Sequence, residues 1–222
     1  MRKKTTVLLI LVTVFCCGVM ATAGGFAPVS YDAKSVAKLG IFLAAPFILS
    51  LVDRSVSIRG IFRSRKRGLL AGLLYGAGIY AGMMACYFLL ARWVDFSGLT
   101  ALLFRKVGVR GEDFLWLAVY ASLINSLLEE FFFRGFVLEN LTRSASRRWG
   151  VLFSSAAFAL YYAVAMAGWF SWWAYIPMTA ALFGAGVGLC RLNEKYGTTY
   201  VSWLVHMAVN FALGTAGYLL LR

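Results

Sequence analysis

The sequence predicts an all-α, polytopic transmembrane helical bundle of about seven spans. Of its 222 residues 61% are hydrophobic and only 14% are charged, whereas a soluble domain is nearer half apolar and a quarter charged. The apolar residues fall into runs of about 17 to 25, the length with which a helix crosses a hydrocarbon core. No run alternates apolar and polar residues as a barrel strand does, so helices are expected to carry these runs through lipid.

The first apolar run, about residues 5–26, follows a basic segment and has two interpretations. It could be a signal peptide, since Ala21-Thr22-Ala23 resembles a cleavage site behind a basic N-terminal region. It is equally long enough to be a retained first span, which the topology below favours.

Six further spans and a polar stretch follow. Residues 92–113 mix four basic and three acidic residues and are expected to form a polar loop with an amphipathic piece. We interpret the chain as one integral membrane domain. Residues 1–113 hold the N-terminal helices and a basic loop, and residues 114–222 hold the core helices. The six spans are expected at about residues 36–52, 69–91, 114–138, 151–167, 170–189 and 200–221.

The basic residues indicate the topology. With the N-terminus inside, fourteen Lys and Arg residues fall on the cytoplasmic side and seven, including Lys34 and Lys38, on the other. This bias agrees with the positive-inside rule and predicts a cytoplasmic N-terminus and an external C-terminus. Because the basic residues lie at span ends, the net charge of +13 indicates membrane headgroups rather than nucleic acid as the partner.

Small residues in the spans are expected to serve packing. In the third span, two interleaved small-xxx-small pairs predict close helix approach; these are Gly72, Gly76, Gly78 and Gly82. The cysteines have no CxxC spacing, so they fit neither a disulfide framework nor a zinc site. They are Cys16, Cys17, Cys86 and Cys190.

Two acidic residues, Glu129 and Glu130, lie deep in the fourth span. A charged carboxylate at that depth costs at least a few kcal/mol, so it needs a partner or a water-filled cavity. Arg134 follows Glu130 by one helical turn and is expected to form its ion pair. Glu129 points about 100° away, and its own helix offers it no counter-charge. This buried carboxylate therefore suits a general base.

The single histidine, His206, lies in the last span with Asn210 one turn later on the same face. Intramembrane polar residues are functional candidates, although a lone histidine is often structural. At 1.5 Å per residue, Glu129 and Asn210 each lie roughly 15 Å from the cytoplasmic ends of their spans. We therefore expect Glu129, Tyr162 and His206 to surround one cavity that opens toward the cytoplasmic side.

These residues resemble a known family. Glu129-Glu130-Phe-Phe-Phe-Arg134 is similar to the EExxxR motif of the CAAX protease and bacteriocin-processing (CPBP) intramembrane proteases, which include the type II CAAX prenyl endopeptidases. His206-Met-Ala-Val-Asn210 is similar to their HxxxN motif, and the resemblance covers roughly residues 114–212. EExxxR alone is only moderately specific, but the two motifs together in membrane helices are quite specific.

The resemblance implies proteolysis within the membrane. It implies that Glu129 activates a water for attack on a peptide carbonyl. It further implies that Glu130 and Arg134 hold the helix geometry, and that His206 and Asn210 face the oxyanion. The substrate would be a membrane-associated or lipidated peptide or protein, and the location a bacterial plasma membrane.

One position departs from the family pattern. An intermediate FxxxH motif should fall in the fifth span, where Phe158 is present but Tyr162 stands in place of the histidine. Tyrosine can donate a hydrogen bond but is a poor proton acceptor near neutral pH. Although the family was first described as metal-dependent, a single histidine argues against a metal site, so no cofactor is expected.

Two main functions therefore stay open. Either Tyr162 supports a glutamate-driven endopeptidase, or catalysis is lost and the fold serves as a binding scaffold or regulator. A transporter is a weaker third interpretation, since no repeated halves are recognisable.

Overall fold

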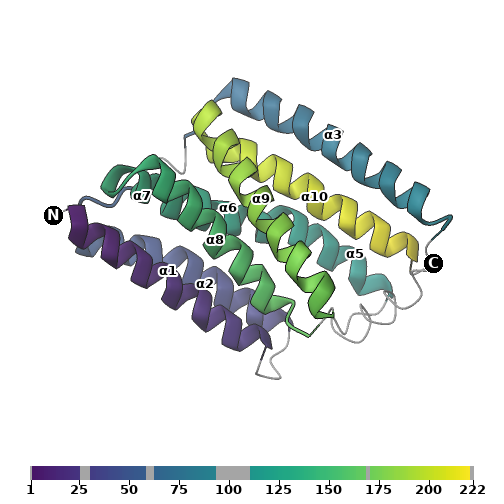
Figure 1. Ribbon diagram of the computed structural model, residues 1–222, viewed down its shortest axis with the longest axis horizontal. Coiled ribbons are helices and arrows are strands. Elements are labelled where there is room, and N and C mark those ends of the chain that lie inside the picture. The colour runs from purple at the N-terminus through teal and green to yellow at the C-terminus, as the bar shows by residue number, and fades with distance from the viewer. Residues whose placement is uncertain (1, 26–30, 59–62, 94–110, 169–170, 221–222) are drawn as a thin grey trace. The chain divides into compact units, whose positions relative to one another are not determined.

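A computed structural model describes residues 2–25, 31–58, 63–93, 111–168 and 171–220, and the ribbon is drawn in Figure 1. The described residues form helices and no strand, which confirms the predicted all-α class. Six helical stretches are long and apolar enough to cross a membrane, so the chain is a multi-pass membrane protein. The predicted fifth span is not among these six. The stretches are Arg2–Ala21, Ser35–Val52, Lys66–Leu90, Phe114–Ser144, Trp172–Tyr196 and Thr199–Leu220.

The first of two compact units consists of Met1–Arg65 and Leu128–Thr199. Its helices α1 and α2 correspond to the first two predicted spans, and α8 and α9 to the fifth and sixth. In the same unit, η3 forms the end of the fourth predicted span and α7 continues it. This span therefore extends to Ser144 rather than to residue 138. The bounds are α1 Arg2–Gly25, α2 Tyr31–Val52, η3 Phe131–Leu138, α7 Glu139–Ser144, α8 Arg147–Ala165 and α9 Trp172–Tyr196.

The second unit consists of Lys66–Leu127 and Tyr200–Arg222. It holds α3 (Lys66–Leu90), α5 (Gly111–Tyr120), η2 (Ala121–Asn125) and most of α10 (Thr199–Leu220). The short helix α6 (Ser126–Glu130) links η2 to η3 along the chain. Most of the predicted polar loop, residues 94–110, lies outside the described residues.

Within the second unit, α3 and α10 lie side by side (Figure 1). Two of the four predicted packing glycines explain this: a Cβ at Gly72 would lie 2.8 Å from the Leu204 side chain, and one at Gly76 would lie 3.2 Å from Ala208 Cβ. Positions 78 and 82 have no atom within 4 Å of such a Cβ in the described structure. Close approach therefore uses one small-xxx-small pair rather than both.

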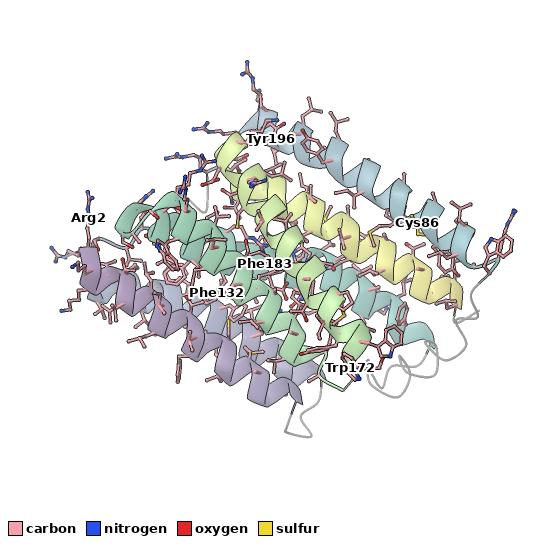
Figure 2. The ribbon with its side chains drawn as sticks, in the orientation of Figure 1. Arg2, Cys86, Phe132, Trp172, Phe183 and Tyr196 are labelled. Carbon is pink, nitrogen blue, oxygen red and sulfur yellow. The ribbon has the colours of Figure 1, made fainter. Side chains whose placement is uncertain are left out.

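The core of the first unit is aromatic. Phe132, labelled in Figure 2, is fully buried and stacks on Phe42 of α2 with ring centroids 4.2 Å apart. Phe133 packs edge-on against Phe42 at 5.8 Å and against Phe158 of α8 at 5.5 Å. Such offset and edge contacts are the favoured aromatic geometries, and they join α2, η3 and α8 around the segment that carries the glutamates.

Polar contacts gather at one end of the first unit. Figure 2 shows Arg2 and Tyr196 toward this end and Trp172 toward the opposite one. Here Thr5 donates to Asp53 at 2.7 Å and Arg147 pairs with Glu194 at 3.0 Å. Hydrogen bonds from Ser55 and Thr5 hold the pKa of Asp53 below its usual value. The segments that the positive-inside rule assigned to one side therefore meet.

The contact between α8 and α9 gives a stability prediction. A Cβ at Gly186 would lie 3.1 Å from both Cα and Cβ of Ser155, whereas at Gly184, on the same helix, it would meet nothing within 4 Å. We expect Gly186→Ala to lower the free energy of unfolding by about 1–3 kcal/mol through overpacking. Gly184→Ala, the matched control, should leave it unchanged or raise it by up to about 1 kcal/mol. Thermal unfolding in detergent measures both, and a Gly186→Ala protein as stable as the wild type would contradict the packing described.

Candidate active site

Glu130 and Arg134 form the ion pair that their spacing predicts. Arg134 Nη1 donates to Glu130 Oε1 at 2.8 Å, and both side chains are fully buried. The guanidinium also lies over the Phe158 ring, 4.2 Å from its centroid, so a planar cation covers an aromatic face. Arg134 Nε and Nη2 have no hydrogen-bond partner among the described residues. A buried, closely packed pair of this kind ties η3 to α8.

Glu129 points into a different set of contacts. Its Oε1 pairs with Lys38 Nζ of α2, and its Oε2 accepts a hydrogen bond of 2.7 Å from the Tyr162 hydroxyl of α8. The side chain is 1% exposed. The partners therefore come from other helices, as expected for a carboxylate with no counter-charge in its own helix. Two of the three groups predicted to share a cavity, Glu129 and Tyr162, are in direct contact.

The local backbone explains why the two adjacent glutamates serve different neighbours. Successive side chains of a helix are about 100° apart, so Glu130 faces Arg134 while Glu129 faces Lys38 of α2 and Tyr162 of α8. The following segment η3 is π-helical over eight residues. Stretches of π-helix are rare and occur frequently at functional sites. This segment follows the glutamates directly.

Sequence reasoning missed Lys38. It was counted among the basic residues that flank a span, yet it is 5% exposed and lies inside the α2 helix. Its position is seven residues after the start of α2, roughly 10 Å along the helix axis. The signal was present in the sequence, because Val36, Ala37 and Leu39 surround it with apolar residues. A lysine in an apolar run is costly to bury alone, so its position predicts a buried anion as its partner.

Aromatic rings close around the Lys38 ammonium. Nζ lies 4.9 Å from the centroid of Tyr161 and 5.6 Å from that of Phe42. The rings of Tyr161 and Tyr162 meet edge to face at 5.5 Å. Ring faces attract a cation, so these aromatic residues stabilise the ammonium while shielding the Glu129 pair from its surroundings.

His206 and Asn210 belong to the second unit. His206 is 5% exposed. Asn210 Nδ2 donates to the Ala121 carbonyl at 3.1 Å, and Trp203 Nε1 donates to the Leu123 carbonyl at 3.1 Å. Both carbonyls lie in η2, which is π-helical. The contacts attach α10 to η2, and the placement of His206 beside Glu129 stays a prediction.

The groups that contact Glu129 include an ammonium and a phenol. Among the described residues, no cluster of three or more His, Cys, Asp or Glu side chains could hold one. Metal sites are built from several imidazole, thiolate or carboxylate donors. Here one carboxylate oxygen contacts an ammonium, which repels a second cation, and the other accepts from a phenol.

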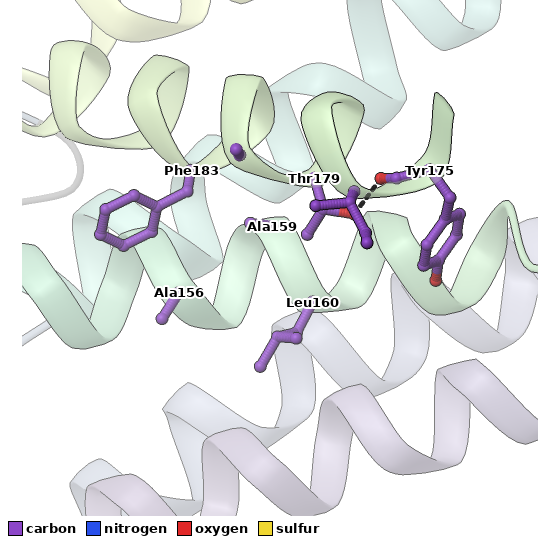
Figure 3. Close-up of a pocket in the computed structure, with 8 residues that line it drawn as sticks. Ala156, Ala159, Leu160, Tyr175, Thr179 and Phe183 are labelled. Atoms are coloured by element: carbon purple, nitrogen blue, oxygen red, sulfur yellow. Dashed lines mark hydrogen bonds between the residues drawn. The ribbon is translucent and has the colours of Figure 1, made fainter. Parts of the chain in front are cut away.

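A separate groove of about 510 Å³ lies between α8 and α9 (Figure 3). In this view Phe183 and Tyr175 lie toward its two ends, with Ala159 and Thr179 between them. Its lining is almost wholly apolar and includes none of Lys38, Glu129 or Tyr162. The groove is thus distinct from the candidate active site and suits the hydrocarbon of a bilayer.

The fold and the site together define a multi-pass membrane protein with a buried, cation-paired glutamate. Residues 111–212 match the family model described as type II CAAX prenyl endopeptidase Rce1-like. This match confirms the resemblance to the family. No curated protein and no solved structure matches the chain.

Proposed function

We propose that this protein is an intramembrane endopeptidase that cleaves a membrane-associated or lipidated peptide, with Glu129 as the general base. Membership of residues 111–212 in the Rce1-like family supports CAAX-protease-type activity. The observation that carries the finer proposal is the Glu129 carboxylate, 1% exposed and contacted on each oxygen by a donor from another helix. A fixed carboxylate in a low-dielectric site can take a proton from water without reorganising.

In the proposed reaction Glu129 accepts a proton from a water whose oxygen attacks the scissile carbonyl. The same proton then passes to the leaving amine. His206 and Asn210 would donate hydrogen bonds to the oxyanion, and Glu130 with Arg134 would hold the helix that presents Glu129. No metal or other cofactor takes part in this scheme.

The partners of the proposal are a membrane peptide or protein as substrate and the lipid bilayer as solvent, without nucleic acid. A bacterial plasma membrane with the N-terminus in the cytoplasm fits the basic residues at one end of the first unit. In this topology a substrate would reach Glu129 from the cytoplasmic side of the membrane.

A cleavage assay tests the proposal. Purified full-length protein in proteoliposomes is offered C-terminal membrane peptides with and without a prenyl group, and products are identified by mass spectrometry. Wild type should release a defined C-terminal fragment, and Glu129→Gln should not. If the prenylated peptide alone is cut, the substrate is a CAAX-type lipidated one. Absence of cleavage from both peptides would count against the endopeptidase and in favour of the scaffold.

Tyr162 gives a second prediction, because its hydroxyl contacts Glu129 directly. Tyr162→Phe keeps the ring packed on Phe158 but removes a hydrogen bond to a charged group, which is worth about 1.5–3 kcal/mol. We expect kcat to fall about 10- to 100-fold. Tyr162→His should keep activity near the wild-type level, because an imidazole can donate to the carboxylate and can share the base role.

The matched control is Tyr175→Phe, which deletes a hydroxyl that donates to the Ala163 carbonyl. This change should leave kcat unaltered. Equal kcat values for Tyr162→Phe and wild type would show that the hydroxyl contact plays no part in the reaction.

A further inference from the structure

Lys38 is a charged group for which neither the family motifs nor the membrane topology gives a use. Its side chain is 7% exposed and its ammonium contacts Glu129 Oε1. Burying an ion pair often brings no net stability, because the desolvation of two charges offsets their attraction. Replacing a buried ion pair by apolar residues of similar volume is often neutral or stabilising. The retention of a charged pair at this place therefore calls for a reason other than stability.

The geometry suggests what the ammonium does for the carboxylate. Lys38 and Tyr162 approach different oxygens of Glu129 from two helices, so the plane of the carboxylate is fixed. Each carboxylate oxygen has two acceptor positions, so an oxygen that already accepts from one donor can also accept from a second. An ammonium donor is complementary to a carboxylate, which is the form that a general base needs.

The charge balance of the reaction points the same way. At the start the Lys38–Glu129 pair is neutral overall. When an O–H bond of water breaks, its proton goes to Glu129, the water oxygen bonds to the carbonyl carbon, and the carbonyl oxygen takes the negative charge. Glu129 is then neutral, and the Lys38 ammonium is the counter-charge of the oxyanion. When the carbon–nitrogen bond breaks, the amine takes the proton and Glu129 is again the counter-charge of Lys38.

We propose that Lys38 is a positioning residue of the active site, which orients the Glu129 carboxylate and keeps the site electrically neutral throughout the reaction. This inference rests on the proposed endopeptidase function. In a site of low dielectric constant, an unbalanced charge is far more costly than in water, so the effect falls on the chemical step rather than on substrate binding.

The test compares the full-length protein with Lys38→Gln, Lys38→Arg and the exposed control Lys66→Gln in the same proteoliposome assay. Lys38→Gln should lower kcat about 10²-fold, as loss of one electrostatic stabiliser does elsewhere, with KM nearly unchanged. Lys38→Arg keeps the charge and should recover a measurable share of that loss. Lys66→Gln should match the wild type.

Stability is separated from chemistry by a double variant. Lys38→Gln/Glu129→Gln removes both charges, so it should unfold at a higher temperature than either single variant, while its activity stays as low as that of Glu129→Gln. If Lys38→Gln does not fold, Lys38→Met decides, because it keeps most of the length of the side chain without its charge: a kcat about 10²-fold below that of the wild type supports the inference, and an equal kcat overturns it.

The outcomes also distinguish this inference from the function on which it rests. An active wild type, an inactive Glu129→Gln and a Lys38→Gln with unchanged kcat would overturn the role of Lys38 alone. A wild type that cleaves neither peptide would overturn both.

Discussion

Glu129→Gln is expected to lower kcat for peptide cleavage by about 10²- to 10⁴-fold, the usual contribution of a general acid–base group. The amide has nearly the same volume as the carboxylate but cannot take a proton from water. It also leaves the buried Lys38 ammonium without its anion, so the variant should unfold at a lower temperature. Single-turnover cleavage in proteoliposomes measures the chemical step, and circular dichroism confirms that the helices are present.

The control for this variant is Glu139→Gln, which makes the same change ten residues later. Glu139 pairs with Arg143 at the surface and its side chain is 25% exposed, so its loss should leave kcat unaltered. A Glu129→Gln protein that cleaves as fast as the wild type would remove Glu129 from the reaction. The domain would then have to use another base or none.

The helical architecture was predictable because the physical demand of the bilayer is strong and local. Each long apolar run must satisfy its backbone hydrogen bonds internally, and four of the seven predicted spans recur as long apolar helices within about five residues of their expected bounds. The sixth recurs as Trp172–Tyr196, which ends seven residues later than expected. The fourth recurs as Phe114–Ser144, six residues longer. The six added residues include Arg143. A helix can continue beyond the hydrocarbon core with charged residues, so the apolar run alone did not indicate where this helix ends. The fifth predicted span corresponds to α8, which is not among the six long apolar stretches. This helix begins with the charged residues Arg147 and Arg148.

Contacts within one helix were equally predictable, and contacts between helices were not. The Glu130–Arg134 pair follows from a spacing of four residues. The Lys38–Glu129 pair joins residues 91 positions apart, and no periodicity relates them. A search for charges inside apolar runs would have found both partners, because each is expensive alone and both are needed to make one neutral pair.

The contact between Tyr162 and Glu129 was only partly predictable from the sequence. The family pattern placed a residue of the fifth span beside Glu129, and Tyr162 does contact it at 2.7 Å. What the pattern could not supply is how a phenol replaces an imidazole. In the structure the phenol donates to the carboxylate, and the second donor is an ammonium from α2. The catalytic roles of these groups stay predictions that the variants above test.

Arg134→Ala is expected to lower the free energy of unfolding by about 3–5 kcal/mol, because it strands a buried carboxylate. Glu130 and Arg134 are both fully buried, so water cannot replace the lost counter-charge. The guanidinium also packs on the Phe158 ring at 4.2 Å, and alanine leaves that space unfilled. Denaturation in mixed micelles, followed by tryptophan fluorescence, measures the change, and a reduced yield of protein in the membrane should accompany it.

Two comparisons isolate burial as the cause. Arg143→Ala removes the same kind of partner at the same spacing, from Glu139, but its side chain is 50% exposed. An exposed pair of this type contributes only about 0.3–0.5 kcal/mol. Arg134→Lys keeps the charge without the planar stack on Phe158 and should fall between wild type and Arg134→Ala. If Arg134→Ala were as stable as Arg143→Ala, the Glu130 carboxylate would not depend on its ion pair. Arg134 would then have to serve substrate or chemistry instead of the fold.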